Sequence, residues 1–369
     1  MKAIALFTQN LSTGGVQKSV SSLANYLSSI YKVNIILAED DKSIEYELEN
    51  GINIYKIKTK IIDIEKDGVG EEIFKYRVEA LDAILEKLNV DLALSYEDYN
   101  NLILLQTKAR CKKLVSCRVS LSQSYKTKNP IHLLDSSFYF EMIRELYPKA
   151  DAVIAVANHI KDELLALNPS MKTCTIYNGI KELEVIKDSI SDEDFILNIG
   201  RLHPQKGQKD LIYAFNSIKD EIEQNLIILG DGVLKKELES LILELDLGER
   251  VFLKGFSDPY PYIQKCDLFV FPSYYEGFSN SILEVMSMAK AIVSYNYAGA
   301  NEILPLDSLV ECSDIEGLSK KMLTYIKNKD ANKLLADKLY LTSKNFSLEK
   351  NLKTFEDKIA QEMERICVE

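Results

Sequence analysis

Short apolar segments alternate with longer amphipathic ones along almost the whole chain, and this alternation limits the folds open to it. Ala3–Phe7 is an uninterrupted apolar run, and Val16–Ile30 after it repeats apolar residues at helical spacing. Val33–Leu37 begins the next such pair. Near-continuous apolar strands separated by amphipathic helices are typical of parallel sheets covered by helices on both faces. The sequence therefore predicts an α/β fold built from βαβ units.

The alternation occurs in two sets, separated by the polar stretch Lys181–Asp194. Because 369 residues exceed what one hydrophobic core usually spans, two domains are expected. We predict Rossmann-like domains over residues 1–182 and 183–345, whose parallel sheets face each other across a deep cleft, with helix 346–369 completing the first. The other strand-like segments are Leu92–Ser95, Leu114–Cys117 and Ala152–Val156 in the first set, and Phe195–Ile199, Leu226–Leu229, Val251–Leu253, Leu268–Phe271 and Ala291–Ser294 in the second.

Composition and charge argue against several classes of protein. The net charge of −11 disfavours nucleic acid as the main partner, because phosphate backbones need a basic surface. No stretch approaches 18 apolar residues, and the opening MKAIALF lacks the features of a signal peptide. Six scattered cysteines without a CxxC pair, and only three histidines, favour reduced thiols and no metal site. We expect a cytoplasmic protein.

One segment departs from this acidic balance. Between Lys108 and Lys128 there are basic residues but no acid. A solvated loop accounts for this run, and so does a patch that faces anionic lipid or a pyrophosphate-bearing acceptor, where each cation contributes about 1 kcal/mol. The second interpretation predicts a peripheral position on the inner face of the cell membrane. The basic residues are Lys108, Arg110, Lys112, Lys113, Arg118, Lys126 and Lys128.

The first candidate binding motif is Gly14-Gly15, between the first predicted strand and the first predicted helix. Glycines at such a turn let the backbone approach a ligand, and the helix start offers free N–H groups to a phosphate. A plain turn gives the same pattern, and neither a GxGxxG fingerprint nor a Walker loop is present.

The second motif follows the strand Phe195–Ile199 and has the sequence GRLHPQKG. Gly200 and Gly207 bracket a turn that brings Arg201 and Lys206 to the carboxyl end of the strand. Arg can grip phosphate oxygens with two parallel hydrogen bonds, and Lys adds a compact second charge. The pair therefore matches a pyrophosphate.

The third motif follows the strand Leu268–Phe271 and places two carboxylates seven residues apart. Glu276 lies in the loop, and Glu284 lies in a helix that Ser279 or Asn280 caps. Carboxylates suit sugar hydroxyls, and the N–H groups of a helix start suit phosphate oxygens. One motif thus offers partners to both ends of a nucleotide sugar.

These motifs also carry a resemblance to a known family. In order and spacing, GRLHPQKG, the Gly230–Gly232 turn, FPSYYEGFSNSILEVM and YAGANEI resemble the series found in glycosyltransferase family 4, whose members have the GT-B fold of two Rossmann-like domains. The match is continuous from Ile176 to Ile303. The first half resembles the family through Gly14-Gly15, ADAVIAVANHIKDEL and TIYNGI.

The resemblance implies roles for individual residues. Arg201 and Lys206 would hold the donor diphosphate, Glu276 would meet the hydroxyls of the transferred sugar, and Glu284 would bind the ribose hydroxyls. Gly15 would face the phosphate from the other domain. Arg201, Lys206 and Glu276 are the predicted catalytic residues, and the predicted donor-binding residues are Gly14, Gly15, Gly200, Arg201, Lys206, Phe278, Ser279, Asn280 and Glu284.

The resemblance also implies an activity. Family members transfer a sugar with retention of anomeric configuration and without a metal or other cofactor. We predict transfer of a hexose or N-acetylhexosamine from a nucleotide diphosphate sugar, UDP being favoured, to a saccharide or lipid-linked saccharide in surface polysaccharide or glycolipid synthesis. Two alternatives stay open: a non-catalytic subunit that binds a sugar nucleotide, and a UDP-sugar epimerase with the same fold.

The chain departs from the family pattern at a few positions. Where the family has Gly and Pro after the second Glu helix, this chain has Ala289 and Ala291. Where many relatives have a histidine on the acceptor side, this chain has Arg118. We predict that Arg118 lies on the acceptor side. Asp192-Glu193-Asp194 matches the DxD string of a metal site, but it precedes a strand instead of following one, and we attribute it to chance.

Overall fold

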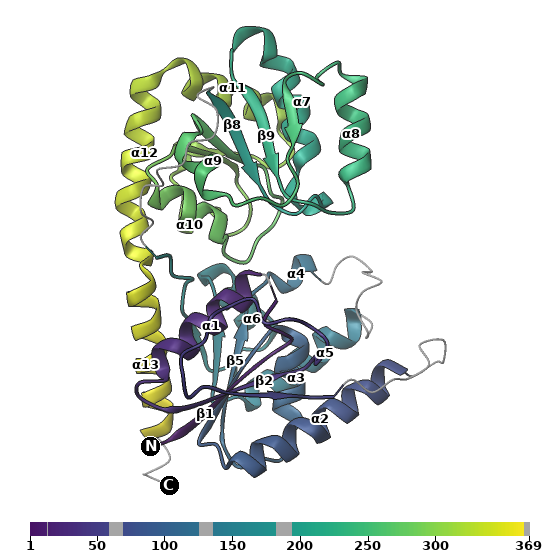
Figure 1. Ribbon diagram of the computed structural model, residues 1–369, viewed down its shortest axis with the longest axis vertical. Helices are drawn as coiled ribbons and strands as arrows, with labels where there is room; N and C mark the ends of the chain where they lie inside the picture. Colours follow the sequence, from purple (N-terminus) through teal and green to yellow (C-terminus); the bar gives the residue numbers. More distant parts are fainter. Residues whose placement is uncertain (13, 59–68, 125–135, 182–193, 365–369) are drawn as a thin grey trace. The chain divides into compact units, whose positions relative to one another are not determined.

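A computed structural model describes residues 1–12, 14–58, 69–124, 136–181 and 194–364. The chain divides into two compact units (Figure 1). Unit 1 comprises Met1–Asn178 and Glu349–Glu369, and unit 2 comprises Gly179–Leu348. The polar stretch Lys181–Asp194 and its DxD string lie almost wholly outside the described residues.

Unit 1 is built on a parallel sheet with the strand order β3-β2-β1-β4-β5-β6-β7 among the described residues. The strand β1 lies beside both β2 and β4, pairing Ile4 with Val33 and with Leu92. Its residues are fully buried or nearly so, as a strand covered on both faces requires. The strands are β1 (Ala3–Thr8), β2 (Lys32–Leu37), β3 (Asn53–Lys56), β4 (Leu92–Tyr96), β5 (Lys112–Cys117), β6 (Ala152–Ala155) and β7 (Thr173–Thr175).

The helices of unit 1 form two groups. Because β1 connects to β2 in one direction across the sheet and β4 to β5 in the other, right-handed crossovers place α1 and α3 on opposite faces. The C-terminal helix α13 packs beside α1, where the Tyr26 hydroxyl donates to Glu356 over 2.6 Å (Figure 1). The helices are α1 (Gly15–Leu27), α2 (Val69–Leu88), α3 (Asp98–Gln106), α4 (Leu121–Ser124), α5 (Ser136–Leu146), α6 (Asn158–Leu167) and α13 (Leu348–Glu364).

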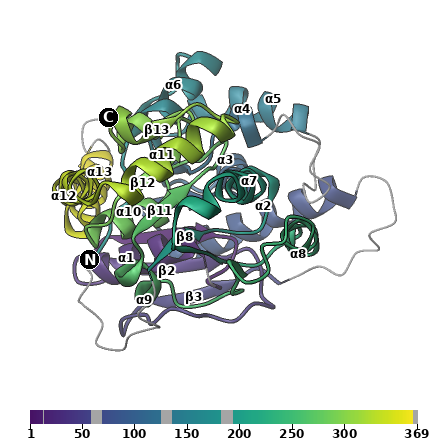
Figure 2. The same ribbon diagram turned by 90° about the horizontal axis from the view of Figure 1, so that it is seen from above.

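Unit 2 has a second parallel sheet, with the order β10-β9-β8-β11-β12-β13 in the described part. Figure 2 shows α7, α8 and α11 on one side of this sheet and α9 and α10 on the other. The strands are β8 (Phe195–Ile199), β9 (Asn225–Leu229), β10 (Val251–Leu253), β11 (Leu268–Phe271), β12 (Ile292–Tyr295) and β13 (Leu309–Val310). The helices are α7 (Gln208–Ile218), α8 (Lys235–Glu244), α9 (Tyr260–Lys265), α10 (Asn280–Ser287), α11 (Ile315–Lys327) and α12 (Lys329–Ser343).

The predicted fold class, α/β with two parallel sheets, is confirmed, and every segment predicted as a strand contains one. The strands that the sequence did not reveal are β3, β7 and β13, each at the edge of its sheet. The strand β3 is largely exposed and β7 is half-buried, so neither carries the continuous apolar run of a central strand. The two-residue strand β13 is buried but too short to show a pattern.

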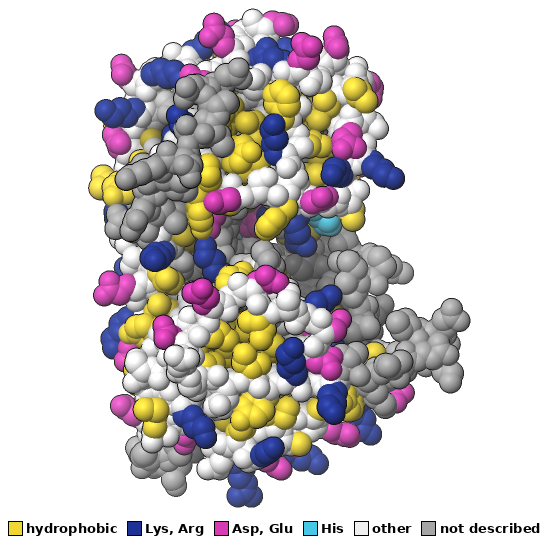
Figure 3. Space-filling view, viewed as in Figure 1, with side chains coloured by type: hydrophobic (Ala, Val, Ile, Leu, Met, Phe, Trp, Pro, Cys, Tyr) yellow, Lys and Arg dark blue, Asp and Glu magenta, His cyan; other side chains and the backbone are white. Residues whose placement is uncertain are grey.

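The described residues of Lys108–Lys128 lie at both ends of β5, and contact of this run with an anionic surface stays a prediction. Lys112 pairs with Asp151 at 3.1 Å at the start of β5, whereas Arg118 follows the other end of that strand. Six residues at about 3.3 Å each separate them by roughly 20 Å. Lys and Arg side chains on the face in Figure 3 are likewise interspersed with Asp and Glu. Lys126 and Lys128 lie outside the described residues.

The cysteines at described positions are free thiols, in agreement with the predicted reduced state. Burial raises the pKa of the Cys111 thiol to about 11 and that of the Cys266 thiol to about 12, so both are unreactive structural groups. None of the described helices combines the length and the apolar character that a membrane span needs.

The departure from the family pattern at Ala289 has a backbone consequence. Ala289 follows α10 and has φ = 53°, a conformation that glycine adopts without penalty. A Cβ in the left-handed region costs about 1 kcal/mol. The positive φ explains why the family pattern has glycine at this position. This chain has alanine there although the backbone conformation favours glycine.

We predict that Ala289→Gly raises the free energy of unfolding by about 1 kcal/mol, because glycine removes this penalty. Urea denaturation followed by circular dichroism measures it. Ala291→Gly is the matched control: Ala291 is fully buried and does not have a positive φ, so this change is expected to lower stability. Loss of stability in Ala289→Gly would contradict the argument.

Candidate active site

The two motifs of unit 2 meet at one edge of its sheet. The strands β8 and β11 are neighbours, with Leu268 paired to Ile196, and both run in the same direction. Their carboxyl ends therefore lie side by side, and so do the loops that follow them, Gly200–Gly207 and Pro272–Ser279. Ligands of open α/β sheets bind at this position.

Hydrogen bonds join the two loops directly. Gln205 is the link, since its backbone carbonyl accepts from the Tyr274 N–H at 2.9 Å and its side-chain amide donates to the Tyr275 carbonyl at 2.7 Å. Gln208 steadies the base of the first loop by donating to the Arg201 carbonyl at 2.9 Å. The loops are thus held as one surface before any ligand arrives.

Lys206 and Glu276 meet at the centre of this surface. The Lys206 ammonium lies 2.6 Å from Glu276 Oε1, and the two side chains are only 15% and 10% exposed. The ammonium also lies 5.3 Å from the centre of the Phe271 ring, a favourable cation–π distance. An ammonium has three N–H donors, so Lys206 can be oriented by Glu276 and still donate to a phosphate.

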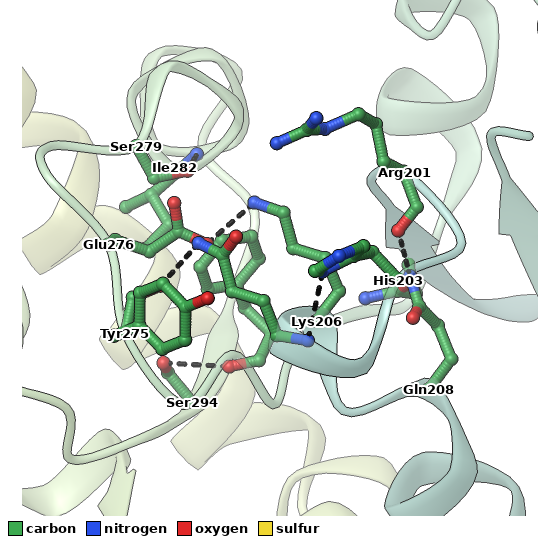
Figure 4. Close-up of polar contacts among 12 residues, drawn as sticks. Arg201, His203, Lys206, Gln208, Tyr275, Glu276, Ser279, Ile282 and Ser294 are labelled. Carbon is green, nitrogen blue, oxygen red and sulfur yellow. Dashed lines mark hydrogen bonds and ion pairs between the residues drawn. The ribbon is translucent and has the colours of Figure 1, made fainter. Parts of the chain in front are cut away.

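Arg201 adds the second positive charge. Its side chain is exposed, and Figure 4 shows the guanidinium extending into the space beside the Lys206 ammonium. Burial and the charges of Arg201 and Lys206 lower the pKa of His203, so the imidazole between them is neutral at pH 7. His203 Nδ1 instead accepts from the Gln205 N–H at 3.3 Å. The site therefore offers two cations, with His203 supporting the loop.

The helix α10 begins beside these cations. Ser279 is its N-cap and accepts from the Ile282 N–H at 3.4 Å, as one of the two predicted caps. The remaining N–H groups of Asn280 and its neighbours at the helix start, together with the helix dipole, favour an anion. Phe278 anchors the turn by packing on Phe346, with ring centres 5.4 Å apart.

The two glutamates of the third motif occupy different surroundings. Glu276 faces Lys206, whereas Glu284 lies further along α10 and accepts a 3.3 Å hydrogen bond from the Tyr260 hydroxyl at the start of α9. This hydrogen bond ties Glu284 to the start of α9, the helix that follows β10. The separation suits a ligand long enough to contact both carboxylates.

Close backbone contacts explain the glycines of these loops. Gly207 has φ = 63°, and a Cβ there would overlap the Pro272 carbonyl oxygen of the neighbouring loop. A Cβ at Gly230, where φ = 138°, would overlap the Gly200 carbonyl oxygen in the same way. The loop that carries Arg201 and Lys206 thus packs closely against the backbone at Pro272 and at Gly230, and these contacts fix the position of the loop.

Sequence reasoning did not identify Asp210, a residue of α7 that supports this surface. Its Oδ2 accepts from the hydroxyls of Tyr274 and Tyr295, each at 2.7 Å. Burial and the hydrogen bond to Asp210 raise the pKa of Tyr274 to about 12. The partners are 64 and 85 residues away in sequence, so no local pattern could have revealed the cluster.

The remaining predicted site residues belong to unit 1. Gly14 exchanges two hydrogen bonds with the Tyr46 hydroxyl, at 3.0 and 2.9 Å, and Gly15 is the first residue of α1. Arg118 donates to Asn178 Oδ1 at 2.5 Å, and its guanidinium lies 5.9 Å from the centre of the Tyr96 ring. The phosphate and acceptor roles of these residues stay predictions.

Two family models match adjacent parts of the chain. The model described as Glycosyltransferase Family 4 matches residues 13–182, and the model described as Glycosyl transferases group 1 matches residues 180–355. The second match includes both loops that carry Lys206 and Glu276. The chain belongs to glycosyltransferase family 4. It is therefore a transferase, and the family resemblance of the motifs is confirmed.

Similar proteins extend this result over the whole chain. A Campylobacter jejuni protein named N-acetylgalactosamine-N,N'-diacetylbacillosaminyl-diphospho-undecaprenol 4-alpha-N-acetylgalactosaminyltransferase is 29% identical over 94% of this chain and 96% of its own. Sucrose-phosphate synthase from Thermosynechococcus elongatus has a TM-score of 0.86 at 18% identity and covers 98% of this chain and 99% of its own. Anabaena HepE in complex with UDP-glucose has a TM-score of 0.77 at 18% identity over 98% of this chain and 100% of its own. The fold is GT-B.

We predict that Gly207→Ala destabilises unit 2 by about 3 kcal/mol, because the added methyl combines a left-handed penalty with overpacking against Pro272. Thermal unfolding measures the loss. Gly248→Ala is the matched control, since a Cβ there meets no atom within 4 Å and should leave the melting temperature nearly unchanged. Equal stability of the two variants would mean that the loops do not pack as described.

Proposed function

We propose that this enzyme is a retaining glycosyltransferase that moves a hexose or N-acetylhexosamine from a UDP-sugar to a saccharide carried by a lipid. The observation that carries the proposal is the buried Lys206–Glu276 pair with Arg201 beside it, at the carboxyl edge of the sheet in unit 2. This arrangement places two cations, suited to a diphosphate, next to a carboxylate that suits sugar hydroxyls.

In this proposal Arg201 and Lys206 bind the donor diphosphate. Negative charge grows on that diphosphate as the bond to the sugar breaks, and preorganised cations stabilise the charge in the transition state. The N–H groups at the start of α10 add to the same effect. The two cations and a helix N-terminus supply the charge compensation that a divalent metal provides in other transferases, so we propose that no metal is required.

Glu276 orients the donor sugar in the same scheme. Its carboxylate holds Lys206 in place and accepts hydrogen bonds from sugar hydroxyls, which fixes the reacting carbon relative to the diphosphate. Glu284 accepts from the ribose hydroxyls, at the other end of the nucleotide. The acceptor hydroxyl gives its proton to the departing diphosphate.

The chemistry named for similar proteins supports the choice of substrates. The C. jejuni relative is named for transfer of N-acetylgalactosamine to a saccharide on diphospho-undecaprenol, and HepE is described with UDP-glucose bound. A UDP-N-acetylhexosamine donor and a saccharide on a lipid diphosphate are therefore the first substrates to test.

We predict that Arg201→Ala lowers kcat by about 10²-fold or more, because it removes stabilisation of the transition-state charge. Arg201 is exposed, so the fold should not change. Lys209→Ala is the matched control: Lys209 lies nearby but pairs with Glu237 on the surface, and its loss should change kcat less than twofold. Full turnover in Arg201→Ala would overturn the phosphate assignment.

A thermal-shift titration tests donor binding separately from turnover. We predict that UDP raises the melting temperature by mass action, equally with Mg²⁺ and with EDTA. Loss of the shift in EDTA would contradict metal independence, and a shift without any transfer product would favour a non-catalytic subunit. A changed sugar without an acceptor would identify an epimerase.

A further inference from the structure

Unit 1 carries an unusual turn at the carboxyl edge of its own sheet. The strand β4 ends at Tyr96 and the helix α3 begins at Asp98, so Glu97 alone makes the turn, with φ = 72° and ψ = 136°. This conformation costs a residue with a side chain about 1–3 kcal/mol, and such strain concentrates at functional sites. A sharp strand-to-helix turn also presents the reactive side chain of α/β-hydrolases.

The Glu97 side chain is held by polar neighbours rather than by a cation. Its Oε2 accepts from the backbone N–H of Gln9, which follows β1, and from the side-chain amide of Asn100, both at 3.2 Å. Next to these, the Gln9 side-chain amide donates to Glu39 at 2.7 Å. Carboxylates and carboxamides that follow the three neighbouring strands β2, β1 and β4 thus form one cluster, in which Glu97 is half-buried.

A second observation points to a missing ligand. Asn100 is fully buried, and although its amide nitrogen bonds Glu97, its carbonyl oxygen Oδ1 has no partner among the described residues. The buried hydroxyl of Tyr96, the residue before Glu97, is likewise unpartnered there. Buried polar groups are nearly always hydrogen-bonded, so the unpartnered Asn100 Oδ1, on the same amide that bonds the half-buried Glu97, indicates where a hydroxylic ligand completes the set.

The charge of the cluster selects the kind of ligand. The cluster has more acidic than basic groups: three carboxyl groups, of Glu39, Glu97 and Asp98, against the guanidinium of Arg118. This excess of acidic groups disfavours a diphosphate as the ligand. Burial, reinforced by the charges of Asp98 and Glu39, raises the pKa of Glu97 to about 7. Near neutral pH this carboxyl both donates and accepts hydrogen bonds, as pairs of sugar hydroxyls require.

We propose that Glu97, with Gln9 and Asn100, is a subsite that binds hydroxyl groups of the acceptor saccharide. The proposal rests on the proposed function, which assigns the diphosphate and nucleotide contacts to unit 2 and gives the acceptor no binding residue besides the predicted Arg118. Glu97 is a positioning residue here: it orients the acceptor and takes no part in breaking the donor bond.

The test uses the full chain with UDP-N-acetylgalactosamine as donor and an octyl glycoside of N-acetylgalactosamine as acceptor probe. Glu97→Ala should raise the acceptor KM about tenfold, because it removes a hydrogen-bonding partner of the acceptor hydroxyls, and leave the donor KM within twofold. The melting-temperature shift caused by UDP should not change. Glu141→Gln, which removes an exposed carboxylate paired with Arg144, is the control and should behave as wild type.

A glycine variant separates function from folding. Glu97→Gly relieves the backbone at φ = 72°, so its melting temperature should equal or exceed that of wild type while its acceptor KM rises at least tenfold. Two results would overturn the subsite. One is a wild-type acceptor KM in both Glu97 variants, and the other is a lower melting temperature together with an equal rise in KM for donor and acceptor. Absence of any turnover by wild type would instead overturn the proposed function on which it rests.

Discussion

The ion pair between Lys206 and Glu276 is the interaction on which the candidate site depends. It joins two loops that are 70 residues apart in the chain, and it does so where solvent screening is weak, because both side chains are mostly buried. A buried lysine without its partner would be costly, so the fold that buries Lys206 must also place Glu276 beside it. The geometry that stabilises this pair is the same geometry that presents cation and carboxylate together to a ligand.

The parallel sheet makes this arrangement possible. Adjacent parallel strands end at one edge, so the loops after β8 and β11 leave the sheet side by side. Gln205 then fixes their separation through two backbone contacts, and Gly207 and Gly230 allow a backbone approach that no side chain would permit. Rigidity here comes from backbone contact, which fixes the point in the loop from which the exposed Arg201 side chain extends.

Local strain marks two other positions, with different meanings. Ala289 has a positive φ at the end of α10, where the family pattern has glycine. The strain at Ala289 accompanies no functional group among the described residues. Glu97 also has a positive φ, but its carboxyl accepts hydrogen bonds from amide groups at a strand end. A glycine at position 97 would relieve the strain and would also remove this carboxyl. The side chain, not the dihedral angle, distinguishes the two.

The sequence by itself determined the fold class, the positions of the central strands along the chain and the residues of the donor motifs. Each is encoded locally: apolar runs mark buried strands, glycines mark tight turns, and the donor motifs keep a fixed spacing of Arg201, Lys206, Glu276 and Glu284. The exposed or very short edge strands β3, β7 and β13 lacked that signal. Only the tertiary structure decided that Lys206 pairs with Glu276, that Asp210 receives two tyrosines, that the basic run is divided by β5, and that Glu97 is strained and surrounded by amides. Each of these depends on which strands become neighbours. Contacts between residues tens of positions apart follow from that pairing, and no local pattern in the chain records it.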